Sequence, residues 1–119
     1  MTVNEYQQAA ARTINPELDA TATINHAVFG LNSEAGEIAG IYQKIYQKHP
    51  IDFDALQKEI GDAAWFLAEL CTAYGWSLEV VLQKNIDKLK KRYPDGFSGE
   101  RSLHRPEYAE RTESGLTDE

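Results

Sequence analysis

The chain has 119 residues, of which 42% are hydrophobic, and a formal net charge of -7 at pH 7. This length fits one domain with a small core, so subunit association is a natural way to bury more apolar surface. The acidic balance argues against a nucleic-acid-binding protein, which would present a basic face, but it allows a polyanionic small substrate bound through a bridging cation.

Several features favour a cytoplasmic protein without membrane contact. The single cysteine, Cys71, excludes an internal disulfide, suits a reducing cytosol and lies in the apolar run 66–71, where a small buried side chain is expected. The N-terminal sequence lacks the basic start and apolar stretch of a signal peptide. No run of about 18 apolar residues is present to cross a bilayer.

The first two predicted helices cover residues 3–14 and 20–48. Thr2 and Glu5 form a T-x-x-E capping box at the start of the first helix. In the second, apolar residues recur at spacings of three and four from Ile24 onward, which is typical of a helix with one buried face.

The third and fourth predicted helices cover residues 53–74 and 78–93. Gly75 stands where a helix commonly ends in a glycine, and Pro94 stops the fourth helix. No strand pattern competes, and the short connections predict antiparallel neighbours. We therefore expect an all-α fold that resembles a four-helix bundle, with a domain over 1–97 and a polar C-terminal tail over 98–119.

Two pairs of acidic residues carry the strongest functional signal. Glu34 and Glu37 lie on the second helix, and Glu59 and Asp62 on the third, each pair spaced i,i+3 and so on one face. At about 100° per residue these acids fall within or beside the apolar stripes, so they should meet at the helix interface. Clustered carboxylates repel one another, and a divalent cation such as Mg²⁺ removes that repulsion.

Two alternatives to a magnesium site exist for the same residues. Paired acids are common on solvated helix faces, but two pairs on core-facing sides favour a metal site. A di-iron carboxylate bundle requires Glu-x-x-His motifs, and none of the histidines stands three residues after a glutamate: His26, His49 and His104.

Glycines beside the acids predict close backbone approach, and they are Gly30, Gly36, Gly40 and Gly61.

The fourth helix and the aromatic residues supply candidates for substrate contacts. Asn85, Lys88 and Arg92 share one face, with Asn85 expected in the apolar stripe, and the two cations either bind phosphate or form a solvated basic face. His26 shares the face of Glu37 and either lines a base pocket or is simply exposed. Aromatic residues could stack on a nucleobase, although they more often belong to a core: Phe29, Tyr42, Trp65, Phe66 and Trp76.

Three sequence blocks occur in order, GLNSEAGE at 30–37, KEIGD at 58–62 and KNIDKLKKRYP at 84–94. Together they resemble the MazG-like branch of the all-α nucleotide pyrophosphohydrolases, over about residues 6–97. The resemblance implies hydrolysis of nucleoside triphosphates, often deoxy or non-standard ones, to the monophosphate and pyrophosphate. It also implies assembly as a homodimer or homotetramer.

The resemblance further implies residue roles. Mg²⁺, with Mn²⁺ as a substitute, would be held by Glu34, Glu37, Glu59 and Asp62. Phosphate would be held by Asn85, Lys88 and Arg92, with Tyr93 near the sugar or phosphate. Many members carry a further glutamate directly before the first pair, where this chain has Ser33, so the general base is expected to be Glu34 or Glu37.

Two rival functions remain open at this point. The same fold could act on another pyrophosphate, such as a phosphoribosyl-ATP. Alternatively, the chain could be a non-catalytic helical oligomerisation module that has kept the acidic face. Assays on nucleoside triphosphates and on phosphoribosyl-ATP distinguish the two enzymatic functions. An absence of magnesium binding would favour the non-catalytic module.

Overall fold

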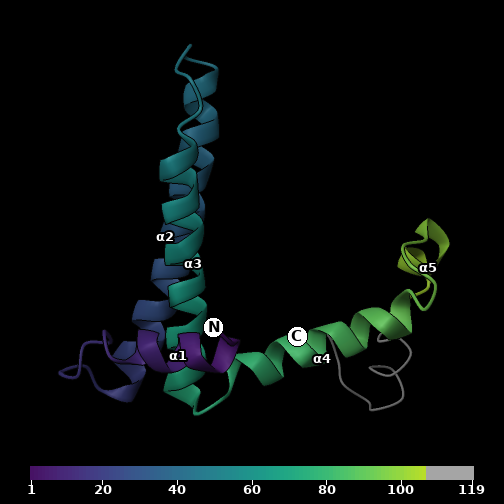
Figure 1. The fold of residues 1–119 in the computed structure, drawn as a ribbon, viewed down its shortest axis with the longest axis horizontal. Coiled ribbons are helices and arrows are strands. Elements are labelled where there is room, and N and C mark those ends of the chain that lie inside the picture. Colours follow the sequence, from purple (N-terminus) through teal and green to yellow (C-terminus); the bar gives the residue numbers. More distant parts are fainter. Residues whose placement is uncertain (107–119) are drawn as a thin grey trace. The chain divides into compact units, whose positions relative to one another are not determined.

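The computed structural model describes residues 1–106, and every regular element in this range is a helix (Figure 1). The helices are α1 (Val3–Ala11), α2 (Ala20–Ile45), α3 (Phe53–Tyr74), α4 (Leu78–Arg92) and α5 (Gly99–Leu103). The predicted all-α fold with long helices is confirmed. The short helix α5 was not predicted, and residues 107–119 of the predicted tail lie outside the described residues.

The chain divides into two compact units, one ending at Glu79 and the other beginning at Val80, and helix α4 starts in the first and continues in the second. Among the helices of the described range, none combines the length and hydropathy that a bilayer crossing requires.

The helix starts follow the capping residues of the sequence. The Thr2 hydroxyl accepts the Glu5 N–H at 3.1 Å, and the carboxylates of Asp19 and Asp52 accept the N–H groups of the third residues of α2 and α3. Gly75 ends α3 with a left-handed φ of 72°, a conformation that costs glycine little. These contacts satisfy N–H groups that a helix terminus leaves without partners.

Two helices end earlier than predicted. Helix α1 stops at Ala11 rather than near residue 14, and the Thr13 hydroxyl donates to the Ala10 carbonyl in the turn that follows. Helix α2 stops at Ile45 rather than near residue 48, and Lys48 adopts a φ of 65°. A left-handed residue cannot continue a right-handed helix, so the chain has already turned before Pro50.

In the first unit, α2 and α3 lie side by side as an antiparallel hairpin, and α1 packs against α3 (Figure 1). The buried cluster lies where α1, α3 and the start of α4 meet, and its members are Ala10, Ala68, Cys71 and Leu78. Gln7 ties these elements together, since its side chain donates to the Trp76 carbonyl at 2.8 Å and accepts the Leu78 N–H at 2.7 Å. The expected burial of Cys71 is confirmed.

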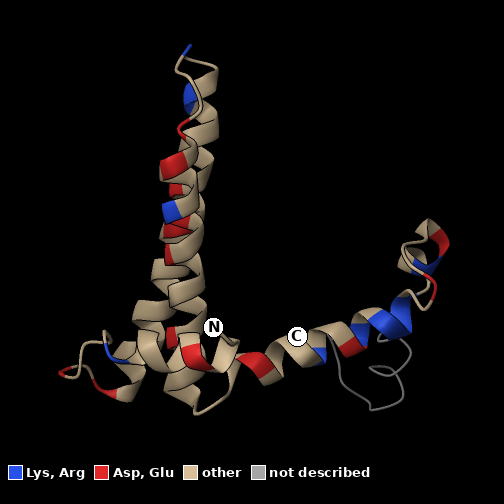
Figure 2. Ribbon diagram, viewed as in Figure 1, with Lys and Arg blue, Asp and Glu red and all other residues tan. Residues whose placement is uncertain are grey.

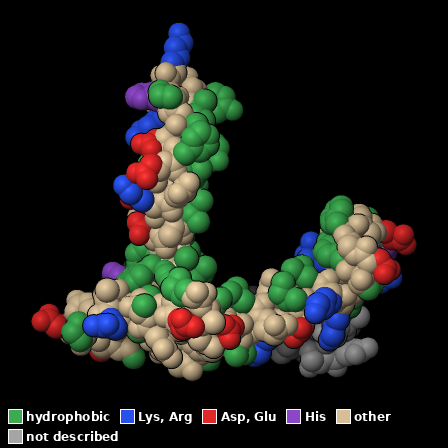
Figure 3. Space-filling model, in the orientation of Figure 1, with side chains coloured by type: hydrophobic (Ala, Val, Ile, Leu, Met, Phe, Trp, Pro, Cys, Tyr) green, Lys and Arg blue, Asp and Glu red, His purple; other side chains and the backbone are tan. Residues whose placement is uncertain are grey.

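The hairpin exposes an apolar edge. Figure 3 shows hydrophobic side chains along one edge of the hairpin and acidic side chains along the other. Large apolar residues of α2 and α3 that remain more than 40% exposed include Val28, Tyr42, Ile45, Ile60 and Leu67. A contiguous apolar surface of this kind commonly marks an interaction site, so it agrees with the expected subunit association, which stays a prediction.

The glycines of the hairpin differ from the expectation of close approach. A Cβ atom added at Gly30 would collide with the Phe66 ring, whereas one added at Gly36, Gly40 or Gly61 would meet no atom within 4 Å beyond the adjacent backbone of its own helix. The expectation is therefore confirmed for Gly30 and wrong for the other three within the described chain.

This difference yields a stability prediction. Gly30→Ala should lower the free energy of unfolding by about 1–3 kcal/mol, because the new methyl group overpacks the Phe66 ring. Gly40→Ala is the matched control and should raise it by up to about 1 kcal/mol, since alanine favours the helix and meets open space. Urea unfolding of both variants measures the contrast, and equal effects of the same sign would contradict the packing described here.

Candidate metal centre

Three carboxylates converge where α2 faces the middle of α3. Glu34 on α2 and Glu59 and Asp62 on α3 each offer one oxygen atom, and these atoms all lie within 4.8 Å of one another. The i,i+3 spacing on α3 places its two acids on one face, and the acidic positions on both helices are visible in Figure 2. Glu34 and Glu59 are half-buried, whereas Asp62 is exposed.

Glu37, one turn after Glu34, joins this group at its edge. Hydrogen-bonding contact with Glu59, followed by charge repulsion from it, raises the pKa of Glu37 above the ordinary carboxyl value of 4.5. The pKa of Glu59 is also raised, and its largest cause is contact with Glu34. The structure thus brings all four predicted acids together, while their roles as ligands stay a prediction.

The residues fit a divalent cation. Glu34 Oε2 and Glu59 Oε2 are buried and lack a hydrogen-bond partner among the described residues, an arrangement that is costly for a charged group. The neighbouring acids add repulsion rather than relief. A hard cation that takes carboxylate oxygens, such as Mg²⁺, would satisfy these atoms and cancel the repulsion.

The raised pKa values give a pH prediction for the metal-free protein. Both carboxyls hold their protons more tightly in the folded state, so they contribute stability that is present below about pH 4.5 and is lost as pH rises through the folded-state pKa values. As pH rises from about 4.5 through the folded-state pKa values, the melting temperature of wild type should therefore fall relative to that of Glu59→Gln, whose amide side chain cannot ionise. Added Mg²⁺ should remove the difference in slope, because it binds the ionised form. If, without metal, the melting temperatures of the two proteins changed with pH in the same way, the raised pKa values assigned to Glu37 and Glu59 would be contradicted.

The predicted phosphate-binding residues lie on α4 and just beyond it, in the unit that begins at Val80. Asn85 and Lys88 are exposed, whereas Arg92 and Tyr93 are half-buried. The expected burial of Asn85 is wrong, and Leu82 of the same stripe is also 44% exposed. A stripe identifies residues that share a face, but it does not show whether another element covers that face.

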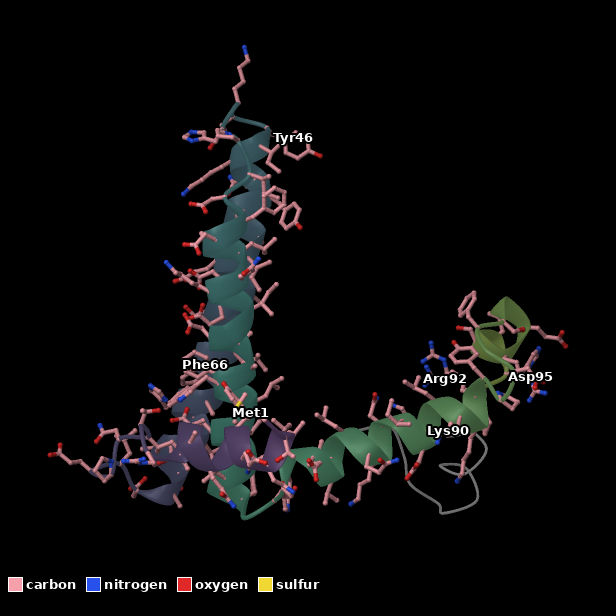
Figure 4. The ribbon with its side chains drawn as sticks, in the orientation of Figure 1. Met1, Tyr46, Phe66, Lys90, Arg92 and Asp95 are labelled. Atoms are coloured by element: carbon pink, nitrogen blue, oxygen red, sulfur yellow. The ribbon has the colours of Figure 1, made fainter. Side chains whose placement is uncertain are left out.

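Within this second unit, Arg92 and Tyr93 form a local cluster. The guanidinium of Arg92 lies 5.6 Å from the centre of the Tyr93 ring, and the Phe97 ring lies 5.4 Å from it. The pKa of the Tyr93 hydroxyl is lowered, first by its hydrogen bond with Ser102 and also by Arg92. Figure 4 labels Arg92 near the end of α4. Ser102 belongs to the unpredicted helix α5, so the predicted polar tail contributes to this cluster.

Sequence reasoning missed one buried acid. Glu69 on α3 is only 1% exposed, and its Oε1 atom lies 2.7 Å from Nδ1 of His26 on α2. Glu69 stands inside the apolar run 66–71, where the pattern predicts buried hydrophobic side chains rather than an acid. The available signal was its spacing, since Glu69 follows Asp62 by seven residues and so shares the face of the acidic pair.

Comparison with known proteins identifies the family of the chain. The MazG nucleotide pyrophosphohydrolase domain matches residues 23–97, a span that contains all four clustered acids. The Gene 37 protein of Mycobacterium phage L5 is 36% identical over 105 residues, which cover 81% of this chain and 92% of that protein. No solved structure matches the chain. The chain therefore belongs to the MazG nucleotide pyrophosphohydrolase domain family.

Proposed function

We propose that the protein is a Mg²⁺-dependent nucleoside triphosphate pyrophosphohydrolase, which converts a (deoxy)nucleoside triphosphate to the monophosphate and pyrophosphate. The observation that carries this proposal is the cluster of Glu34, Glu59 and Asp62, whose oxygen atoms lie within 4.8 Å of one another. Membership of the MazG family supports the reaction class. A polyanionic substrate approaching an acidic cluster needs an intervening cation.

The four acids have separable roles in this proposal. Glu34, Glu59 and Asp62 would hold the cation, which when bound polarises phosphoryl oxygens and makes water a better nucleophile. Glu37 lies outside this trio, and contact with Glu59 raises its pKa, so Glu37 is the proposed general base. As the water oxygen bonds to phosphorus, Glu37 takes the proton and the P–O bond bridging the α and β phosphates breaks.

The cations of α4 are proposed to bind the triphosphate. Lys88→Ala should raise KM roughly tenfold and increase its sensitivity to salt, because Lys88 meets charge already present in the ground state. Lys90→Ala removes the same charge from another face of the helix, and it should leave KM nearly unchanged. Steady-state kinetics at two salt concentrations measures both variants. Equal effects would assign Lys88 to a general basic surface instead.

Assembly as a homodimer or homotetramer forms part of the proposal. It is supported by the apolar edge of the hairpin, where Tyr42, Ile45 and Ile60 are between 41% and 54% exposed. Burial of this edge between subunits would add the apolar surface that a small core lacks. Light scattering that gives the 13.4 kDa monomer alone would contradict it.

An assay panel with product analysis tests the function. Canonical and damaged (deoxy)nucleoside triphosphates, and phosphoribosyl-ATP in parallel, are incubated with the protein with and without Mg²⁺. The expected result is Mg²⁺-dependent release of a nucleoside monophosphate and pyrophosphate in equal amounts. Release of inorganic phosphate, or turnover of phosphoribosyl-ATP alone, would overturn the proposed substrate class. No turnover of any compound would favour the non-catalytic helical module.

A further inference from the structure

A second organised group of side chains lies on the hairpin face that carries the acidic cluster. Successive positions on α2, moving back from Glu34, are Gly30 and then His26, and these face Phe66 and Glu69 on α3. His26 precedes Glu34 by eight residues, which corresponds to about 12 Å along the helix axis. The two groups are therefore neighbours on one continuous surface of the first unit.

A buried carboxylate holds the imidazole of His26 in place. Glu69 Oε1 lies 2.7 Å from His26 Nδ1, and the Glu69 side chain is 0% exposed whereas that of His26 is 49% exposed. Because an ionised carboxylate only accepts hydrogen bonds, this contact favours the tautomer with its hydrogen on Nδ1, and that tautomer offers Nε2 as an acceptor. The second oxygen, Glu69 Oε2, is buried without a hydrogen-bond partner among the described residues.

Two aromatic rings complete the group. The Phe66 ring centre lies 5.7 Å from that of His26, and the Trp65 ring stands edge-on to Phe66 at 5.2 Å. Phe66 rests directly on the backbone at Gly30, where even one methyl group would collide with it. The Trp65 indole N–H donates to the Thr13 hydroxyl at 2.8 Å. Each aromatic ring is thus fixed by a specific contact, while His26, Trp65 and Phe66 all stay partly exposed.

This combination has the properties of a subsite for a flat heterocycle. Aromatic rings offer π-faces and edges that favour another aromatic ring. A half-exposed imidazole whose far side is fixed by a carboxylate offers one directed hydrogen bond. A carboxylate at 1% exposure is costly to bury, and here it holds a histidine whose own side chain is 49% exposed.

We propose that this group is the nucleobase subsite, with His26 Nε2 accepting a hydrogen bond from an N–H or amino group of the base beside Trp65 and Phe66. Glu69 is the positioning residue that sets the orientation of His26. The inference rests on the proposed function, because the phosphates of the same substrate would lie at the acidic cluster. Lys44, which follows Glu37 by seven residues, lies farther along α2 in the opposite direction and suits the pyrophosphate end.

A binding experiment tests the subsite without requiring turnover. The sequence contains two tryptophans, and the Trp76 ring stacks on Tyr74 at 4.5 Å. Trp76→Phe therefore leaves Trp65 as the sole reporter and keeps an aromatic ring at that position. Titration with each deoxynucleoside monophosphate should change the Trp65 emission in a saturable manner for at least one base. Inorganic pyrophosphate should not change it. An emission that no nucleotide alters at millimolar concentration, in a preparation that hydrolyses triphosphates, would overturn the inference and leave the proposed function intact.

Kinetics separate base recognition from a structural role. His26→Ala should raise KM for the preferred triphosphate roughly tenfold, with much smaller effects on the others and on kcat. His26→Gln, which can still accept a hydrogen bond, should restore part of the loss, and Glu69→Gln should show a weaker effect in the same direction. His49→Ala, an exposed histidine at the hairpin tip, is the control and should match wild type. The inference would be overturned if KM rose equally for every base and the melting temperature of the variants fell in parallel. That result would assign a structural role to His26 and Glu69.

Discussion

Asp62→Asn and Glu59→Gln are each expected to lower kcat by about 10²–10³-fold, with a smaller change in KM. Each substitution keeps the shape of the side chain and removes one charge from the cluster whose oxygen atoms lie within 4.8 Å of one another. The lost charge weakens the stabilisation of negative charge that grows as the P–O bond breaks, so the effect belongs to the transition state. Steady-state kinetics at saturating Mg²⁺ measures it.

A matched control lies on the same helix. Asp54 is an exposed acid of α3 that pairs with Lys58 at 2.9 Å, and surface pairs of this kind contribute little. Asp54→Asn should therefore retain wild-type turnover. If Asp62→Asn and Glu59→Gln also hydrolyse triphosphates at the wild-type rate, the acidic face has no catalytic role and the enzyme assignment of this site is wrong.

Glu37→Gln is expected to lower turnover by about 10²-fold or more while Mg²⁺ binding persists. Glu37 lies beside the trio of Glu34, Glu59 and Asp62 rather than within it, and removal of a general base commonly costs 10²–10⁴-fold. Glu34→Gln should lose Mg²⁺ affinity and turnover together, because one oxygen of Glu34 belongs to the trio. Calorimetry with Mg²⁺ and single-turnover kinetics of both variants supply the comparison.

The opposite pattern has a definite meaning. If Glu34→Gln binds Mg²⁺ normally but fails to turn over, Glu34 is the base and Glu37 is the ligand. If both variants lose Mg²⁺ affinity equally, both acids are ligands and the base lies elsewhere. Either outcome would contradict the division of roles proposed for the second helix.

Much of the fold could be predicted because it depends on local signals. The cap at Thr2 and the glycine at Gly75 act within one helical turn, and each is found at its predicted position. The end of α2 was misplaced, because the left-handed conformation of Lys48 depends on the path that the chain takes toward α3. An apolar pattern carries no information about that path.

The acidic cluster was also predictable, since i,i+3 spacing on two antiparallel helices determines which side chains can meet. Glu69 was not recognised, because its meaning depends on His26, which lies 43 residues away in sequence. The exposure of Asn85 could not be foreseen either. Helical periodicity groups residues by face, whereas burial depends on which other element covers that face.

The most direct measurement of the central claim is the location of a divalent cation in the protein. Crystals grown with Mn²⁺, which substitutes for Mg²⁺ and scatters anomalously, should show an anomalous peak bounded by Glu34, Glu59 and Asp62 and absent from Asp62→Asn crystals. If crystals with saturating Mn²⁺ show no anomalous peak at this cluster, although the same protein hydrolyses nucleoside triphosphates, the assignment of these carboxylates as the metal centre is contradicted.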